Sequence, residues 1–134
     1  MSEHDALLKR FHVGQKAFID REGEVLIVFR PNGWFDFPGG RINEGETDII
    51  EALKREVREE TTLEVHVGQP FATWLGRGDT VYLVGYRCRY VSGEVVLSEE
   101  PVSFRWVNRR NFTEVDDDST PFEALRSYFY PSET

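Results

Sequence analysis

Three glutamates within residues 56–60 are the feature that most restricts what this chain can fold into and do. They follow the glycine pair Gly39-Gly40 and close a stretch with helical periodicity. On a helix with about 100° per residue, Glu59 and Glu60 flank Glu56 within an arc of about 100°. Like charges at these spacings destabilise an exposed helix by about a few tenths of a kcal/mol per pair. The cluster therefore indicates a function that keeps the acids together.

The acids overlap the apolar side of this helix, not its solvated side. The apolar positions are Ile49, Leu53 and Val57, and the outward positions are Glu51, Lys54, Arg55 and Arg58. Glu51 and Arg55 have the i, i+4 spacing of an ion pair. Carboxylates crowded beside apolar surface carry a larger penalty, or the pKa of one of them rises. A charge run that is only a solvated surface is therefore the weaker interpretation.

A divalent metal ion resolves this conflict. Carboxylate oxygens in a small group suit Mg²⁺, Mn²⁺ or Ca²⁺, and Mg²⁺ leaves its other positions to water and substrate phosphate. Zinc is disfavoured because Cys88 is the only cysteine and because His4, His12 and His66 are scattered, without ligand spacing. The sequence therefore predicts a site of the magnesium type on this helix.

The segment WFDFPGGRINEGETDIIEALKREVREETTL, residues 34–63, resembles the Nudix box. This box is the signature of hydrolases that cleave the diphosphate linkage in a nucleoside diphosphate attached to another group. The resemblance implies an α+β protein with the Nudix fold, an α/β/α sandwich around a central mixed β-sheet. It also implies a pyrophosphohydrolase that uses Mg²⁺ or Mn²⁺ and metal-activated water.

The same resemblance assigns roles to individual residues. Gly40 matches the box glycine whose main-chain carbonyl helps to bind metal, and Arg55 matches the arginine that orients the following glutamate. Glu56, Glu59 and Glu60 match the carboxylates that bind Mg²⁺ and activate water. Glu56 is the leading candidate for the general base.

Members of the family often draw one more acid from a downstream loop. Glu100, six residues before Trp106, is the first candidate for this acid and is the alternative general base. Glu99 is the second candidate. A solvated turn explains both residues equally well, so both interpretations stay open.

Two positions depart from the family pattern. Eight residues separate Glu46 from Arg55 where the usual box has seven, so the helix entry must absorb one residue and the role of Glu46 stays open. Thr62 stands where the pattern has glycine, at a position that often needs a left-handed backbone. Either Thr62 is strained or the helix ends differently, and we expect a local adjustment with the site retained.

Periodicities elsewhere predict a mixed sheet between helices. One helix is predicted over residues 48–61 with Thr47 as its N-cap, and a second over residues 120–128 after Ser119 or Thr120. Strands are predicted over residues 14–20, 24–30, 63–67, 70–75, 80–91 and 102–108, with turns at residues 21–23 and 76–79 and a loop at residues 38–40. Residues 1–134 are predicted to form a single Nudix hydrolase domain.

The substrate-binding residues are predicted from aromatic and cationic side chains. Trp34 is the main candidate to stack on a base, ahead of Phe37, Trp74, Tyr82 and Trp106, although aromatic residues more often fill a core. Arg41 is a candidate for phosphate contact, as are Lys16 and Arg30, with surface solvation as the equal alternative. The substrate stays open among nucleoside triphosphates, ADP-ribose-like compounds, dinucleoside polyphosphates and capped RNA ends.

Charge and composition restrict the partners. The chain has a net charge of −8 and a pI near 4.9, and a negatively charged protein repels polyanions. We therefore expect no binding to membrane surfaces and no general binding to nucleic acid. The N-terminus shows no apolar run of a signal peptide, and a lone cysteine favours a cytoplasmic protein. The expected partner is a nucleotide-type small molecule. Dimers occur in the family, so a homodimer stays open.

Two other classes of protein are retained as alternatives. The two departures from the box give modest support to a catalytically inactive Nudix-fold module that senses nucleotides or binds proteins. An acidic Ca²⁺-binding protein is the weaker alternative, because the run Asp116-Asp117-Asp118 lacks the alternation and glycine of an EF-hand loop.

Overall fold

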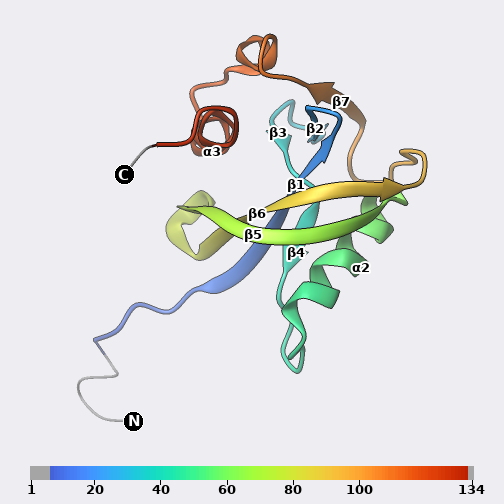
Figure 1. Ribbon diagram of the computed structural model, residues 1–134. Coiled ribbons are helices and arrows are strands. Elements are labelled where there is room, and N and C mark those ends of the chain that lie inside the picture. The colour runs from blue at the N-terminus through green and yellow to red at the C-terminus, as the bar shows by residue number, and fades with distance from the viewer. Residues whose placement is uncertain (1–6, 133–134) are drawn as a thin grey trace.

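The computed structural model describes residues 7–132, so His4 and the start of the polar N-terminus lie outside the described residues. Within that part of the chain, seven strands, two α-helices and two short 3-10 helices follow one another (Figure 1). Their order is β1 (His12–Arg21), β2 (Glu24–Phe29), β3 (Phe35–Asp36), β4 (Gly39–Arg41), α2 (Ile49–Thr61), β5 (Glu64–Leu75), η1 (Arg77–Asp79), β6 (Val81–Ser92), β7 (Ser103–Val107), η2 (Phe112–Val115) and α3 (Thr120–Phe129).

The strands form one mixed sheet. Its central order is β3-β2-β1-β6-β5, with β4 paired to β1 and β7 paired to β2. β1 and β6 run parallel, and the other pairs are antiparallel. The predicted hairpin between β1 and β2 is confirmed. Its turn residues Glu22 and Gly23 both have positive φ, as in the two-residue turns that match the twist of paired strands.

Two parts of the sheet differ from the sequence prediction. Residues 63–67 and 70–75 were predicted as separate strands, but a single strand, β5, runs from Glu64 to Leu75, and its register shifts around Pro70. Such irregularities let an edge strand pass a residue that cannot donate a ladder hydrogen bond. The predicted loop at residues 38–40 is also wrong in part, because Gly39 and Gly40 pair with β1 as part of β4.

Side chains alternate across the sheet and build two cores. On β1, Ala17 and Ile19 pack in the cluster that contains Leu53 of α2, whereas Phe18 packs in the cluster that contains Phe122 of α3. Phe18 stacks on the buried Phe37 with ring centroids 3.8 Å apart. The two helices therefore cover opposite faces of the sheet (Figure 1), which confirms the predicted α/β/α sandwich.

The ends of α2 show how the chain accommodates its local sequence. The predicted N-cap Thr47 is wrong by one residue, since the Asp48 carboxylate accepts the Glu51 N–H at 3.1 Å and its charge favours the positive end of the helix dipole. At the other end Thr62 adopts φ 64°, a left-handed conformation. Its hydroxyl donates to the Glu94 carbonyl at 2.5 Å, which offsets part of the strain.

Helix α3 begins as the sequence predicts. The Ser119 hydroxyl accepts the Phe122 N–H at 3.2 Å, and a proline occupies the first turn. The Tyr128 hydroxyl donates to Asp20 at 2.7 Å and ties the end of α3 to β1. Neither α-helix in residues 7–132 has the length and apolar character needed to span a membrane.

Candidate active site

The sheet divides along β1, which pairs with β2 at one end and with β4 at the other, and this fork positions the candidate site. β1 pairs with β2 at Asp20 and Arg21 and with β4 at residues 14–16. Between these points the segment from β3 to β4 runs beside β1, held by the Ala17 N–H, which donates to the Pro38 carbonyl at 2.8 Å. Gly39 suits this close approach because a Cβ there would collide with the backbone of β1. The fork places Gly40 next to α2.

Glu56 lies directly against Gly40. A Cβ on Gly40 would come 2.7 Å from both Cδ and Oε2 of Glu56, so the glycine leaves the space that the carboxylate fills. Burial raises the pKa of Glu56; Arg55 opposes this shift, and the charge of Glu59 adds to it. The helix and β4 thus hold a half-buried carboxylate at one defined position.

Arg55 connects the acids on one side of the helix. Its guanidinium lies 2.9 Å from Glu59, 3.2 Å from Glu46 and 3.3 Å from Glu56. These hydrogen bonds, the one to Glu59 first, raise the pKa of Arg55. The arginine therefore contacts the next glutamate, as its proposed orienting role requires.

The expected ion pair between Glu51 and Arg55 is wrong. Glu51 pairs instead with Lys54 at 3.6 Å, and Arg55 turns toward the acids. Ile49, predicted on the apolar face, is 39% exposed, and Ile50 packs against the core in its place. Arg55 also pairs with Glu46 of the preceding turn, and helical spacing alone does not contain that information.

Glu46 reaches Arg55 despite the additional residue between them. Its Oε1 accepts the Asn43 N–H at 2.7 Å, and its Oε2 accepts from Arg55 at 3.2 Å. The hydrogen bond from Asn43, followed by that from Arg55, lowers the pKa of Glu46 despite an opposing effect of desolvation. The turn before Asp48 thus absorbs the additional residue and leaves this contact intact.

Glu60 points toward a different set of charges. Its Oε2 lies 3.7 Å from Arg30, within ion-pair range, yet this buried atom has no hydrogen-bond donor among the described residues. Burial raises the pKa of Glu60 to about 7, because it outweighs the opposing effects of Arg30 and Lys16. Glu59, by contrast, has a side chain that is 58% exposed.

The three glutamates therefore do not form a ready metal cage as their side chains stand. No group of three or more acidic, histidine or cysteine side chains within residues 7–132 is arranged to hold an ion. The donor chemistry nevertheless fits a hard divalent cation. Glu60 presents a buried oxygen that lacks a donor, and Glu56 fills the space beside Gly40. Burial raises the pKa of both glutamates, and the neighbouring Arg55 and Arg30 only partly oppose this effect.

Replacing Glu60 by glutamine is expected to stabilise the metal-free protein at pH 8. The folded pKa of Glu60, about 7, lies above its ordinary value of 4.5, so ionisation costs stability as the pH rises through this interval. The amide avoids this cost, which we set at about 1–2 kcal/mol after allowing for partial screening by solvent. Thermal unfolding in chelator should show a gain at pH 8 that disappears near pH 4.5.

The control for this prediction is Glu64→Gln, which removes an exposed carboxylate paired with Arg58 at 2.8 Å. This variant should show no comparable gain. An equal gain for Glu60→Gln at both pH values would contradict the raised pKa.

The downstream acids lie on an exposed loop. The Ser98 N–H donates to the Glu60 carbonyl at 3.0 Å, and the Val102 N–H donates to the Phe29 carbonyl at 2.9 Å, so the loop passes the C-terminal end of α2. Glu99 and Glu100 are exposed, and neither makes a hydrogen bond or ion pair within the described chain. The structure thus brings Glu100 near the helix end but not into the cluster.

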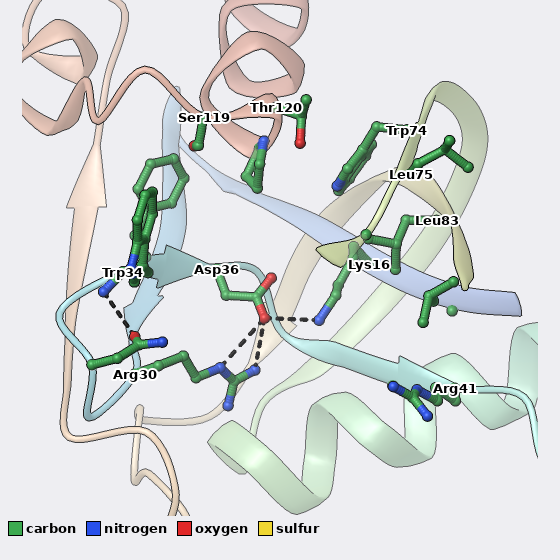
Figure 2. A pocket seen from close by; sticks show the side chains of 17 residues that line it. Lys16, Arg30, Trp34, Asp36, Arg41, Trp74, Leu75, Leu83, Ser119 and Thr120 are labelled. Carbon is green, nitrogen blue, oxygen red and sulfur yellow. Dashed lines mark hydrogen bonds and ion pairs between the residues drawn. The ribbon is translucent and has the colours of Figure 1, made fainter. Parts of the chain in front are cut away.

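A cavity of about 500 Å³ opens beside Gly40. It is lined by Gly14, Lys16, Arg30, Asn32, Trp34, Phe35, Asp36, Gly40, Arg41, Trp74, Leu75, Gly76, Val81, Leu83, Ser119, Thr120 and Pro121. In Figure 2, Trp34 lies on one wall, Trp74 and Leu83 on the facing wall, and Ser119 and Thr120 at the α3 end. The cavity therefore combines flat apolar surface with cationic side chains, next to the carboxylate of Glu56.

The aromatic candidates separate by position. Trp34, which is 42% exposed, and Trp74 line the cavity. Phe37 is fully buried in the core, and Trp106 packs beneath the Arg21 guanidinium at 4.0 Å. Tyr82 lies outside the cavity lining. Two of the five predicted stacking residues thus line the cavity, and their contact with a base stays a prediction.

Sequence reasoning missed Asp36, which lies between Lys16 and Arg30 at the cavity floor (Figure 2). The available signal was an acid between Phe35 and Phe37, because an ionised side chain in an apolar run must find a partner when it is buried. Its partners come from β1 and from the end of β2, and their identity was not readable from the sequence.

Two curated relatives match part of the chain. An 8-oxo-dGTP diphosphatase from Proteus vulgaris is 34% identical over 62 residues, 42% of this chain and 54% of that protein. A CTP pyrophosphohydrolase from Escherichia coli (strain K12) is 37% identical over 62 residues, 42% of this chain and 45% of that protein. The match thus spans about half the length of these relatives.

Solved structures and the family profile extend the likeness to most of the chain. A MutT protein from Methanosarcina mazei Go1 has a TM-score of 0.74 at 26% identity, covering 92% of this chain and 95% of its own. A NUDIX hydrolase from Nitrosomonas europaea shares the fold with a TM-score of 0.76 at 17% identity, covering 91% of this chain and 72% of its own. The NUDIX domain profile matches residues 10–128, and the chain belongs to the NUDIX domain family.

Proposed function

We propose that this protein hydrolyses a phosphoanhydride bond in a nucleoside diphosphate linked to another moiety. The observation that carries the proposal is the Glu56 carboxylate held against Gly40, a residue that lines a cavity with cationic and aromatic side chains. In the reaction, water forms a new bond to phosphorus, the bridging P–O bond breaks, and the bridging oxygen leaves with the second phosphate. Glu56 accepts the proton from the attacking water.

The proposed metal ligands are the Gly40 carbonyl and the carboxylates of Glu56, Glu59 and Glu60. Mg²⁺ or Mn²⁺ bound by these groups would neutralise the diphosphate oxygens and lower the pKa of a bound water. Arg55 orients Glu56 through its 3.3 Å contact and restrains Glu59 through its 2.9 Å contact. Glu100 is the alternative proton acceptor, since its loop is tied to the end of α2.

The proposed substrate contacts lie on the cavity walls. Trp34 offers a partly exposed aromatic face for a base, and Arg41 offers an exposed cation for phosphate. A cavity of about 500 Å³ is within the usual size range for small-molecule sites. The relatives named for 8-oxo-dGTP and CTP support a nucleotide as the substrate class.

The structure reduces the support for the two alternatives. An inactive module was suggested by the displaced Glu46 and by Thr62, but Glu46 still contacts Arg55 and Thr62 caps the helix with a left-handed backbone. In the acidic run, Asp116 accepts the Asp118 N–H and Asp117 accepts the Ser119 N–H, so these carboxylates order their own turn before α3. Hydrolysis therefore remains the function that the geometry supports best.

Incubating the protein with a panel of nucleotides and Mg²⁺ should yield the products of phosphoanhydride hydrolysis, and these products should not form when chelator is added. The panel contains nucleoside triphosphates, ADP-ribose, dinucleoside tetraphosphates and capped RNA, with products resolved by chromatography. Release of a nucleoside monophosphate identifies the broken bond. Metal-independent nucleotide binding without any product would contradict the proposal and favour a sensing module.

A further inference from the structure

The charges around the cavity run against those of the whole chain. The protein carries a net charge of −8, yet the cavity is lined by three cations and one carboxylate. The cations are Lys16, Arg30 and Arg41, and the carboxylate is Asp36. A cationic site in an acidic protein favours an anionic ligand at that position and repels it elsewhere on the surface.

Lys16 and Arg30 are held at the cavity floor by one shared carboxylate. Oδ2 of Asp36 accepts from Lys16 Nζ at 3.0 Å and from Arg30 at 3.1 and 3.3 Å, while Oδ1 accepts the Phe37 N–H at 2.7 Å. Burial alone would raise the pKa of Asp36, but Lys16 and Arg30 outweigh it, so the pKa is lowered. The carboxylate is ionised at neutral pH and fixes the direction of both cations.

The two cations retain hydrogen-bonding capacity that the protein does not use. Their side chains are only 11% and 17% exposed, and each forms its hydrogen bonds within the described chain with Asp36 alone. An ammonium has three donors and a guanidinium five. Glu60, at 3.7 Å from Arg30, is beyond hydrogen-bond distance. Mostly buried donors of this kind are best satisfied by a ligand with several acceptor oxygens.

We propose that Lys16 and Arg30 together form a phosphate-binding site for a phosphate group of the nucleotide, with Asp36 as the residue that positions them. This inference rests on the proposed function and names the groups that hold the substrate before the bond is broken. In Figure 2, Arg30 and Lys16 lie between Trp34 and Arg41. Gly40 precedes Arg41, lines the cavity and lies against Glu56, so a nucleotide with its base at Trp34 directs its phosphates toward Gly40 and Glu56.

Binding of inorganic pyrophosphate in chelator tests the inference without catalysis. Isothermal titration at pH 7 should show saturable binding to the wild-type protein. Lys16→Met and Arg30→Lys should each weaken it about tenfold, because a charged hydrogen bond or the planar guanidinium fork is lost. Lys16→Arg should recover part of the loss. In the active enzyme, both weakening variants should raise KM more than they lower kcat.

The matched control is Lys54→Met, which removes a lysine paired with Glu51 on the outer face of α2 and should leave pyrophosphate affinity unchanged. Thermal unfolding of each variant verifies the fold. If Lys16→Met proves unstable, Arg30→Lys still tests the site, because it keeps a positive charge beside Asp36. The inference is overturned if the wild-type protein shows no saturable binding in chelator. It is also overturned if Lys16→Met and Arg30→Lys lower only the unfolding temperature.

The two proposals fail in different ways. Pyrophosphate binding that depends on Lys16 and Arg30, without hydrolysis of any nucleotide, refutes the enzymatic proposal and keeps the phosphate site. Hydrolysis with unchanged KM in both variants refutes the phosphate site and keeps the enzyme.

Discussion

Glu56→Gln is expected to lower kcat by about three orders of magnitude and to leave the fold intact. Glutamine keeps the shape that fills the space beside Gly40, but it cannot accept a proton or place a negative charge on a metal ion. General base catalysis alone contributes about 10²–10⁴-fold. Because burial raises the pKa of Glu56, the uncharged side chain should not lower the stability of the metal-free protein.

Steady-state kinetics and thermal unfolding, measured on the same preparations, test this separation. The matched control is Glu51→Gln, an exposed glutamate on the outer side of the same helix, which should keep wild-type kcat. Near-normal turnover in Glu56→Gln would move the proton-accepting role to another acid, with Glu100 as the first to test. If Glu56→Gln does not fold, its kinetics cannot be interpreted. Glu56→Asp then tests the base, because it keeps the carboxylate on a shorter side chain.

Helix α2 was predictable because its signals are local. The spacing of the three glutamates and the apolar positions Leu53 and Val57 requires only helical periodicity, and the structure buries both apolar residues. The strands followed from alternation in the same way, since Ala17 and Phe18 occupy opposite cores. Errors in these elements include a cap displaced from Thr47 to Asp48, the exposure of Ile49, the strand limits near Pro70 and the loop predicted at Gly39 and Gly40.

The side-chain partners were not predictable, because segments distant in sequence supply them. Arg55 has Glu51 at a suitable helical spacing, but it pairs with Glu59 on the same helix and with Glu46 from the preceding turn. Asp36 meets Lys16 only because β1 and β2 diverge and admit the segment between β3 and β4. A burial pattern identifies which side of a strand is inside, but it does not identify which charges meet there.

Gly40 contacts Glu56, which is distant in the sequence. Gly40→Ala is expected to lower kcat about a hundredfold. The backbone of Gly40 lies outside the positive-φ region, so alanine is compatible with its conformation. The added Cβ would come 2.7 Å from Cδ and Oε2 of Glu56, and the carboxylate must therefore move. A misplacement of about 1 Å at a reacting group can cost about 10²-fold in rate.

A double-mutant cycle with Glu56→Ala separates this effect from a general disturbance of the fork. Because Gly40→Ala acts by displacing the Glu56 carboxylate, it should weaken Mn²⁺ binding, measured by electron paramagnetic resonance, in the wild-type background and change little once that carboxylate is removed. Gly23→Ala provides the strain control, since Gly23 has φ +88° and no atom within 4 Å of the added Cβ. This control should lower the unfolding temperature while kcat and Mn²⁺ affinity stay at wild-type values. Equal losses of Mn²⁺ affinity in both backgrounds would show that Gly40 acts independently of Glu56, and the proposed origin of the site in this contact would be wrong.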